Sequence, residues 1–168
     1  DLNIKTTDTM ASLPSFSAFT TLLDVPAMSA RETAQAMEYQ ARSLVPLPIL
    51  EVSIDWLPVG EYEDEKGFKR QQIFLISVPN EQVRKYQRIF KAASLNLKAL
   101  EIEGLSLARI LTTGDPTTTL IVDIGGRSTT LAIAEKGFLK YSAQTDWAGA
   151  SITQSITSSM NITARRAD

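Results

Sequence analysis

The sequence predicts two consecutive units, a small α+β domain over roughly the first hundred residues and the opening half of an α/β domain after it. Through residue 103 the hydrophobic pattern gives the element order β-α-β-β-α-β, which predicts an antiparallel sheet with helices on one face. After Gly114-Asp-Pro116 the pattern changes to three strands joined by tight turns and a final helix. The strand over 117–124 is apolar on both faces, which is typical of a strand covered on two sides.

Composition excludes several classes of function. The net charge is −2 over 168 residues, so the chain has no global basic field to attract nucleic acid. It contains no Cys and no His, which excludes disulfides, Cys/His zinc sites, thiol nucleophiles and Ser-His-Asp catalysis. Apolar runs such as Ile73–Ile76 are too short to span a bilayer. Because the chain opens on Asp1 rather than Met and stops at Asp168, we expect a piece of a longer protein.

Local signals place the first elements. Residues 1–14 are polar and predict a connecting segment, and the apolar residues of 17–25 predict a strand. Ser29 and Glu32 form a capping-box sequence, so a helix is expected to run from there to about Val45.

The next elements follow from alternation and helical spacing. We expect a strand at 52–56 closed by Pro58, a strand at 72–78, a helix capped by Asn80 with Asn96 as a left-handed C-cap, a strand at 97–102 and a helix at 104–111.

Two charged surfaces interrupt this part of the chain. The segment 60–67 is an acidic hairpin tip, for which a solvated loop is favoured over a cation site because nothing fixes the geometry that calcium needs. The helix after Asn80 carries its cations on the side opposite its apolar stripe. That basic face fits simple solubility, with a binding surface as the alternative. Its residues are Arg84, Lys85, Arg88 and Lys91.

The turn after the strand 117–124 is a candidate phosphate site. A carboxylate lies near the strand end, where burying it alone would be costly. Two consecutive glycines permit positive φ and let a ligand approach bare N–H groups, and three hydroxyls add donors. The alternative is an ordinary β-hairpin with a glycine-rich turn. The set consists of Asp123, Gly125, Gly126, Arg127, Ser128, Thr129 and Thr130. Two further strands, 128–134 and 138–143, turn at Lys136-Gly137 and lead into a helix at about 150–160.

These residues also carry a family resemblance. The meander and helix resemble the first half of a ribonuclease H-like domain, and Val122-Asp-Ile-Gly-Gly-Arg-Ser-Thr-Thr130 resembles the second phosphate motif of the actin, Hsp70 and sugar-kinase superfamily. Five further stretches are similar to the PilM family of actin-like type IV pilus assembly proteins. They are Ala11–Pro14 leading into Phe19–Pro26, Met28–Glu38, Val45–Pro48, Leu100–Glu103 with Leu107–Arg109, and Ala148–Thr153.

The resemblance implies a division of the chain. It assigns 1–27 to a connecting segment and a strand of subdomain 1A, and 28–103 to the small SHS2-like subdomain 1C. Residues 104–115 become a linker helix, and 116–168 the incomplete first half of subdomain 2A.

The resemblance also implies ATP and Mg²⁺ binding in the intact parent. Gly125, Gly126 and the hydroxyls of 128–130 would contact phosphates, and Asp123 would position Mg²⁺ or its waters. Arg127 would pair with a phosphate or point into water, and Gly149 would approach the nucleotide near the next helix. Because one hairpin cannot hold a nucleotide that lies between two domains, this piece alone is expected to bind ATP weakly or not at all, and not to hydrolyse it.

The implied partner is a PilN-like inner-membrane protein, whose N-terminal cytoplasmic peptide would enter a groove near Thr33, Met37, Ala41 and Leu44. Pilus motor ATPases are further implied partners, and the expected location is the cytoplasm at the inner face of the inner membrane. Residues 116–168 leave a sheet edge and an apolar face uncovered, so self-association of the piece is expected. The alternatives are a type II secretion scaffold of the GspL type without a nucleotide role, an FtsA-like division protein, and a sugar or acetate kinase.

Overall fold

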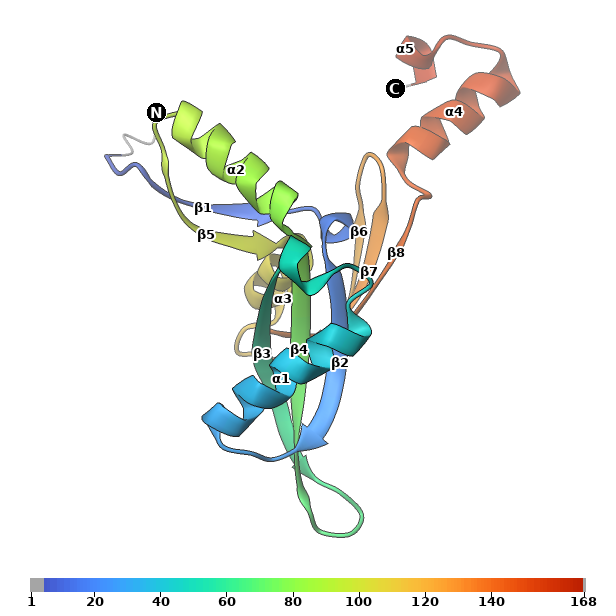
Figure 1. The fold of residues 1–168 in the computed structure, drawn as a ribbon. Coiled ribbons are helices and arrows are strands. Elements are labelled where there is room, and N and C mark those ends of the chain that lie inside the picture. The colour runs from blue at the N-terminus through green and yellow to red at the C-terminus, as the bar shows by residue number, and fades with distance from the viewer. Residues whose placement is uncertain (1–4, 168) are drawn as a thin grey trace. The chain divides into compact units, whose positions relative to one another are not determined.

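The computed structural model describes residues 5–167 and divides into two compact units, one ending at Ser106 and the other beginning at Leu107 (Figure 1). Each unit is described by itself. Residues 1–4 of the predicted connecting segment and Asp168 lie outside the described residues. Within 5–167, no helix is long and apolar enough to cross a membrane.

The first unit is built on an antiparallel sheet of order β2-β4-β3. Its strands are β2 (Phe19–Pro26), β3 (Val52–Glu63) and β4 (Lys69–Pro79), with 3-10 turns at Ser15–Ser17 and Ile49–Glu51. β4 is central because its apolar run is buried on both faces, whereas β2 and β3 carry alternating polar residues and lie at the edges.

Helix α1 (Ala30–Leu44) covers one face of this sheet. The predicted capping box is confirmed, since Ser29 accepts the Glu32 N–H while the Glu32 carboxylate accepts the Ser29 N–H. Met37 and Ala41 are fully buried against Ile73 and Leu75 of β4. The core of the unit therefore lies between α1 and the sheet.

The structure corrects the predicted start and end of this unit. Residues 8–13 form a strand, β1 (Asp8–Leu13), and not a connecting segment. It pairs in parallel with β5 (Asn96–Ile102), so the last strand does not extend the antiparallel sheet as predicted. Parallel pairing needs a long crossover between the strands, and here the antiparallel sheet and both its helices form that crossover. The sequence of β1 hid it because its apolar residues follow no period of two.

Three local predictions are also wrong. Pro58 does not end β3, because β3 is an edge strand that accommodates the proline beside a bulge between Pro58 and Gly60. Asn80 does not cap α2 (Asn80–Ala92): the N-cap is Pro79, and the Asn80 amide bonds Leu50 and Ser53 instead. The left-handed residue after α2 is Ser94, at φ 57°, and not Asn96.

The second unit contains the predicted meander and helix. Helix α3 (Glu103–Thr112) spans the boundary, and the strands β6 (Thr119–Ile124), β7 (Thr129–Glu135) and β8 (Phe138–Thr145) pair in order. Helix α4 (Gly149–Met160) follows, and then the short α5 (Ala164–Ala167). The turn at Lys136-Gly137 is confirmed, with φ of 54° and 84° at its two residues.

One face of β6 is uncovered within the described residues, as expected for residues 116–168 by themselves, although the pattern of the strand is typical of coverage on two sides. Ile121 is buried, but Leu120, Val122 and Ile124 are 63%, 52% and 57% exposed. The apolar character of both strand faces therefore predicted burial that residues 5–167 supply on one face only.

Candidate functional site

The predicted phosphate turn is a closed backbone structure at the tip of β6 and β7. The Gly125 N–H donates to the Ser128 carbonyl at 3.0 Å. The first two amides of α4 donate to the same tip, Gly149 to the Gly125 carbonyl at 3.0 Å and Ala150 to the Gly126 carbonyl at 2.9 Å. The structure thus brings Gly125, Gly126 and Gly149 together, although the first and the last are 24 positions apart in the sequence.

Close approach, and not positive φ, explains two of these glycines. Neither Gly125 nor Gly126 has a positive φ, which corrects the reason given from the sequence. A Cβ on Gly125 would lie 3.0 Å from the Ser128 carbonyl oxygen, and one on Gly149 would lie 3.3 Å from the Gly125 carbonyl oxygen. A Cβ on Gly126 would meet nothing within 4 Å. Gly126 therefore borders open space, where a ligand has access to its backbone.

The hydroxyls of Thr129 and Thr130 do not lie at the surface of the tip. Both residues are buried; Thr129 Oγ1 donates to the Trp147 carbonyl at 2.6 Å, and Thr130 Oγ1 accepts from Gln144 Nε2 at 3.2 Å. The Thr129 bond therefore joins β7 to the segment before α4, and the Thr130 bond joins β7 to β8. Asp123 is half-buried and opposite Thr130 in the β6–β7 register, while Arg127 is exposed.

An open hollow of about 610 Å³ lies between the tip and α4. Thr157 lines it, and the hydroxyl oxygen of this residue is buried without a hydrogen-bond partner among the described residues. The lining residues are small or polar, but most of the surface that they present to the hollow is apolar. They are Gly126, Gly149, Ala150, Thr153, Gln154, Thr157 and Ala164.

A metal ion has few protein ligands here. Within 5–167 there is no group of three acidic residues that could hold a cation, so Asp123 would act alone. A single carboxylate suits Mg²⁺ when phosphates and water complete its octahedron. A cation at the tip would therefore need most of its ligands from groups other than the side chains of the described residues.

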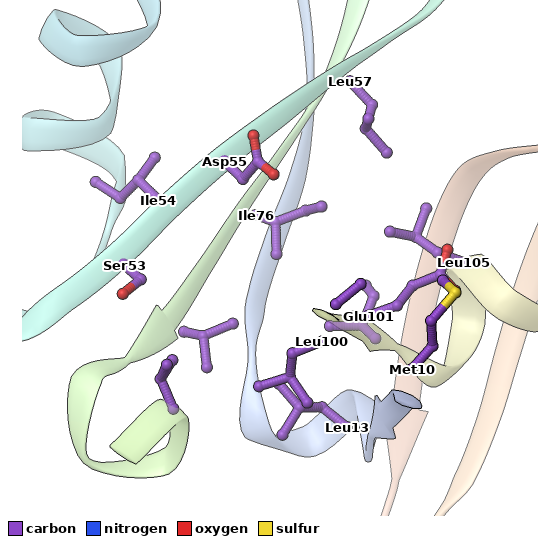
Figure 2. A pocket seen from close by; sticks show the side chains of 14 residues that line it. Met10, Leu13, Ser53, Ile54, Asp55, Leu57, Ile76, Leu100, Glu101 and Leu105 are labelled. Atoms are coloured by element: carbon purple, nitrogen blue, oxygen red, sulfur yellow. The ribbon is translucent and has the colours of Figure 1, made fainter. Parts of the chain in front are cut away.

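The first unit contains a second candidate site, an apolar groove of about 460 Å³ (Figure 2). It could not be found from the sequence, because its residues come from six elements that are far apart in the chain. They are Met10 and Leu13 of β1, Ser53, Ile54, Asp55 and Leu57 of β3, Ile76 and Val78 of β4, Val83 of α2, Ala99 to Ile102 of β5, and Leu105 of α3.

The groove lies along an edge strand. Ser53, Asp55 and Leu57 alternate along β3 and share one face, whereas Ile54 packs against the core beneath α1. The groove therefore lies on the sheet face opposite α1, and β3 is an edge strand of that sheet. The charged lining residues of the groove are both acidic. Asp55 Oδ1 accepts the Trp56 N–H at 2.8 Å, and Glu101 Oε2 accepts the Ser106 hydroxyl at 2.7 Å.

The residues predicted to bind a partner lie elsewhere. Thr33, Met37 and Ala41 are buried beneath α1, where Thr33 Oγ1 accepts from Gln71 Nε2 at 3.0 Å. They form the core, so the structure corrects the prediction that they present a surface to a peptide. The apolar stripe of α1 indicated packing, and only Leu44 at the helix end is exposed.

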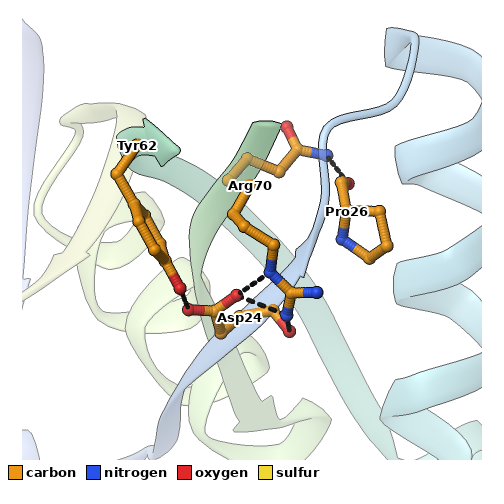
Figure 3. A network of polar contacts seen from close by, with 5 residues as sticks. Asp24, Pro26, Tyr62 and Arg70 are labelled. Atoms are coloured by element: carbon orange, nitrogen blue, oxygen red, sulfur yellow. Dashed lines mark hydrogen bonds and ion pairs between the residues drawn. The ribbon is translucent and has the colours of Figure 1, made fainter. Parts of the chain in front are cut away.

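A polar network joins the three strands of the antiparallel sheet β2-β4-β3 (Figure 3). Arg70 Nε donates to Asp24 Oδ1 at 2.7 Å, and the Tyr62 hydroxyl donates to the other oxygen of the same carboxylate. These two hydrogen bonds, that of Tyr62 first, lower the pKa of Asp24 below its ordinary value, and the pKa of Tyr62 is raised by the same contact. The network ties β2 and β3 to β4 at the end remote from the groove residues of β3.

Two findings place the chain in a class. It has the actin-like ATPase fold, as comparison with solved structures shows. It superposes on a structure described as the PilM-PilN type IV pilus biogenesis complex with a TM-score of 0.78 at 21% identity, covering 95% of this chain and 48% of that one. It also matches the cytoplasmic domain of EpsL, an inner membrane component of the type II secretion system of Vibrio cholerae, with a TM-score of 0.59 at 13% identity, covering 83% and 50%.

The family model of the type IV pilus assembly protein PilM matches residues 5–168, and the chain belongs to this family. It spans about half the length of each of these two solved structures.

Proposed function

We propose that this chain is part of a cytoplasmic scaffold of type IV pilus assembly, which holds an extended N-terminal segment of a PilN-like protein at the inner face of the inner membrane. Family membership supports the pilus system over the secretion alternative. The observation that supports the peptide-binding role is the apolar groove along β3, because the outer edge of this strand pairs with no other strand among residues 5–167. An added strand would bond the β3 backbone, and its alternate side chains would fill the groove.

The charges of the groove narrow the chemistry of the segment. Asp55 and Glu101 line it, and no Lys or Arg does. An acidic segment would be repelled, whereas a mainly apolar segment with a basic residue would be complementary. The exposed apolar residues Met10 and Leu57, 64% and 38% accessible, would be covered when the segment binds.

We test this with a fluorescently labelled peptide copied from the N-terminus of the PilN-like partner, titrated with the protein in an anisotropy assay. Met10→Lys and Leu57→Lys each place a cation in the groove and are expected to weaken binding by about tenfold or more, a loss typical of an interface anchor. The matched control is Leu50→Lys, because Leu50 is 89% exposed and outside the groove. Equal binding by all four proteins would overturn the assignment of the groove.

We further propose that the hairpin tip binds MgATP in a protein of full family length. Gly126 would meet the phosphates with its backbone, and Gly149 would let the chain approach closely. Asp123 would orient waters of the Mg²⁺. The negative charge would come from the phosphates of the bound nucleotide. Closure of the domains around the nucleotide would then change the affinity for the partner.

The nucleotide proposal is tested by calorimetric titration of the full-length protein with MgATP. Binding is expected for the parent and is expected to fall about tenfold or more in Asp123→Ala, since the Mg²⁺ loses its protein anchor. An Asp146→Ala variant is the control, because Asp146 is exposed and does not line the hollow. Absence of MgATP binding by the parent would leave a scaffold with no nucleotide role.

A further inference from the structure

Helix α2 has a basic face that the peptide groove does not use. Its half-buried residues Val83, Tyr86 and Phe90 face the body of the unit, and Val83 lines the groove. Arg84, Arg88 and Lys91 recur at intervals of four and three on the opposite side, where helical geometry puts them in one row. Lys85 flanks this row. We call these four residues the basic row; all four are exposed.

The basic row is not neutralised by the protein. Among residues 5–167, ion pairs are found for Arg42, Arg70, Lys98 and Lys136, and none joins a residue of the basic row to an acidic group. The one acidic side chain of α2 is Glu81, in its first turn. The whole chain has 17 basic and 19 acidic residues, so this concentration of positive charge is local and not a property of the composition.

The surface of the row contains a shallow cationic hollow. The hollow has a volume of about 290 Å³, lies among Arg84, Gln87, Arg88 and Lys91, and is lined by nothing acidic. Arg and Lys donors around a hollow match phosphate oxygens.

We propose that the basic row of α2 rests on the anionic lipid headgroups of a bilayer. Each Lys or Arg near an anionic membrane surface contributes about 1 kcal/mol, within a Debye length of about 8 Å. Single-stranded nucleic acid is a poorer match, because no aromatic side chain of α2 is exposed for base stacking. Contact with lipid is a role separate from peptide binding, and the two agree. Val83 on one face of α2 lines the groove, and the basic row lies on the opposite face. A membrane-anchored partner segment bound in the groove would therefore lie close to the bilayer.

The test is flotation of the protein alone, without a partner peptide, with vesicles of phosphatidylglycerol and phosphatidylethanolamine or of phosphatidylcholine. We expect co-flotation with the anionic vesicles, loss of it at high salt, and no flotation with the neutral ones. The triple variant Arg84→Glu, Arg88→Glu, Lys91→Glu is expected to reduce the bound fraction about tenfold or more, since it reverses three of the four charges.

The control makes the same change of net charge elsewhere, with Arg31→Glu, Arg42→Glu and Lys66→Glu, all exposed and distant in sequence from α2. It is expected to retain flotation. The proposal is overturned if the wild type does not float with anionic vesicles, or if both triple variants lose binding equally. It is also overturned if the basic row binds an acidic protein and no vesicle. Peptide binding is measured in parallel. Retained peptide binding by the α2 variant together with lost flotation is the expected result, whereas a wild type that binds the peptide but does not float would remove the membrane contact and leave the groove in place.

Discussion

A methyl group added to the hairpin tip tests how the tip is built. On Gly125 it would lie 3.0 Å from the Ser128 carbonyl oxygen, so that this carbonyl must move by a few tenths of an ångström. The same carbonyl accepts the N–H of residue 125, and the carbonyl of 125 accepts the Gly149 N–H, so the shift strains both bonds. We expect Gly125→Ala to cost about 1–2 kcal/mol of local stability, near the lower end of overpacking costs. Gly126→Ala has open space and no positive φ, so it is expected to be neutral or stabilising by about 0.4–1 kcal/mol.

The assay is native-state hydrogen exchange by NMR, read at the amides of Gly149 and Ala150, which donate to the tip. A cost of about 1–2 kcal/mol makes these amides exchange roughly 5 to 30 times faster in Gly125→Ala. Gly126→Ala is expected to leave their exchange unchanged or slower. Equal acceleration in the two variants, or none in Gly125→Ala, would refute the inference that close backbone contact requires glycine at position 125.

Three further predictions concern the first unit, each measured by urea unfolding. Met37→Ala is expected to lower the unfolding free energy by about 2–5 kcal/mol, because its side chain is fully buried under α1; a loss below 1 kcal/mol would contradict this. Ser29→Ala removes the capping box with Glu32 and is expected to cost about 1 kcal/mol, whereas no loss would mean the cap is dispensable. Asp24→Asn is expected to destabilise at pH 7, and its difference from wild type to vanish on acidification. The lowered pKa of Asp24 gives stability that is present above the ordinary value of 3.8 and lost as pH falls through the folded value; a difference that persists in acid would exclude this carboxylate as the cause.

Where the sequence carried a strong local signal, the fold could be predicted from it. Ser29 with Glu32 marked the start of α1, and the Lys136-Gly137 turn marked the β7–β8 hairpin. The strand β1 and its parallel pairing could not be predicted, because partners separated by most of a unit leave no local signal. The prediction that Pro58 ends the strand was wrong because proline is excluded only where its missing N–H would be needed for pairing. β3 is an edge strand, which tolerates a proline.

The candidate sites divided in the same way. Only the family resemblance indicated that Gly149 belongs to the same site as Gly125, because no pattern within the chain links them. Neither the resemblance nor any pattern predicted the burial of Thr130. The groove could not be found from the sequence, because strands and helices from across the unit contribute one to four residues each. One hint was available: Met10 and Leu57 are large apolar residues, and they lie outside the strands predicted at 17–25 and 52–56.

The most direct test of the central claim is hydrogen exchange of the first unit with and without the partner peptide. If the peptide adds a strand to β3, edge amides within 53–57 become protected, while amides of the basic row and of the hairpin tip do not change. Protection that appears on α1 or at the tip, with 53–57 unaffected, would contradict the claim that the groove along β3 is where this pilus assembly protein holds its partner.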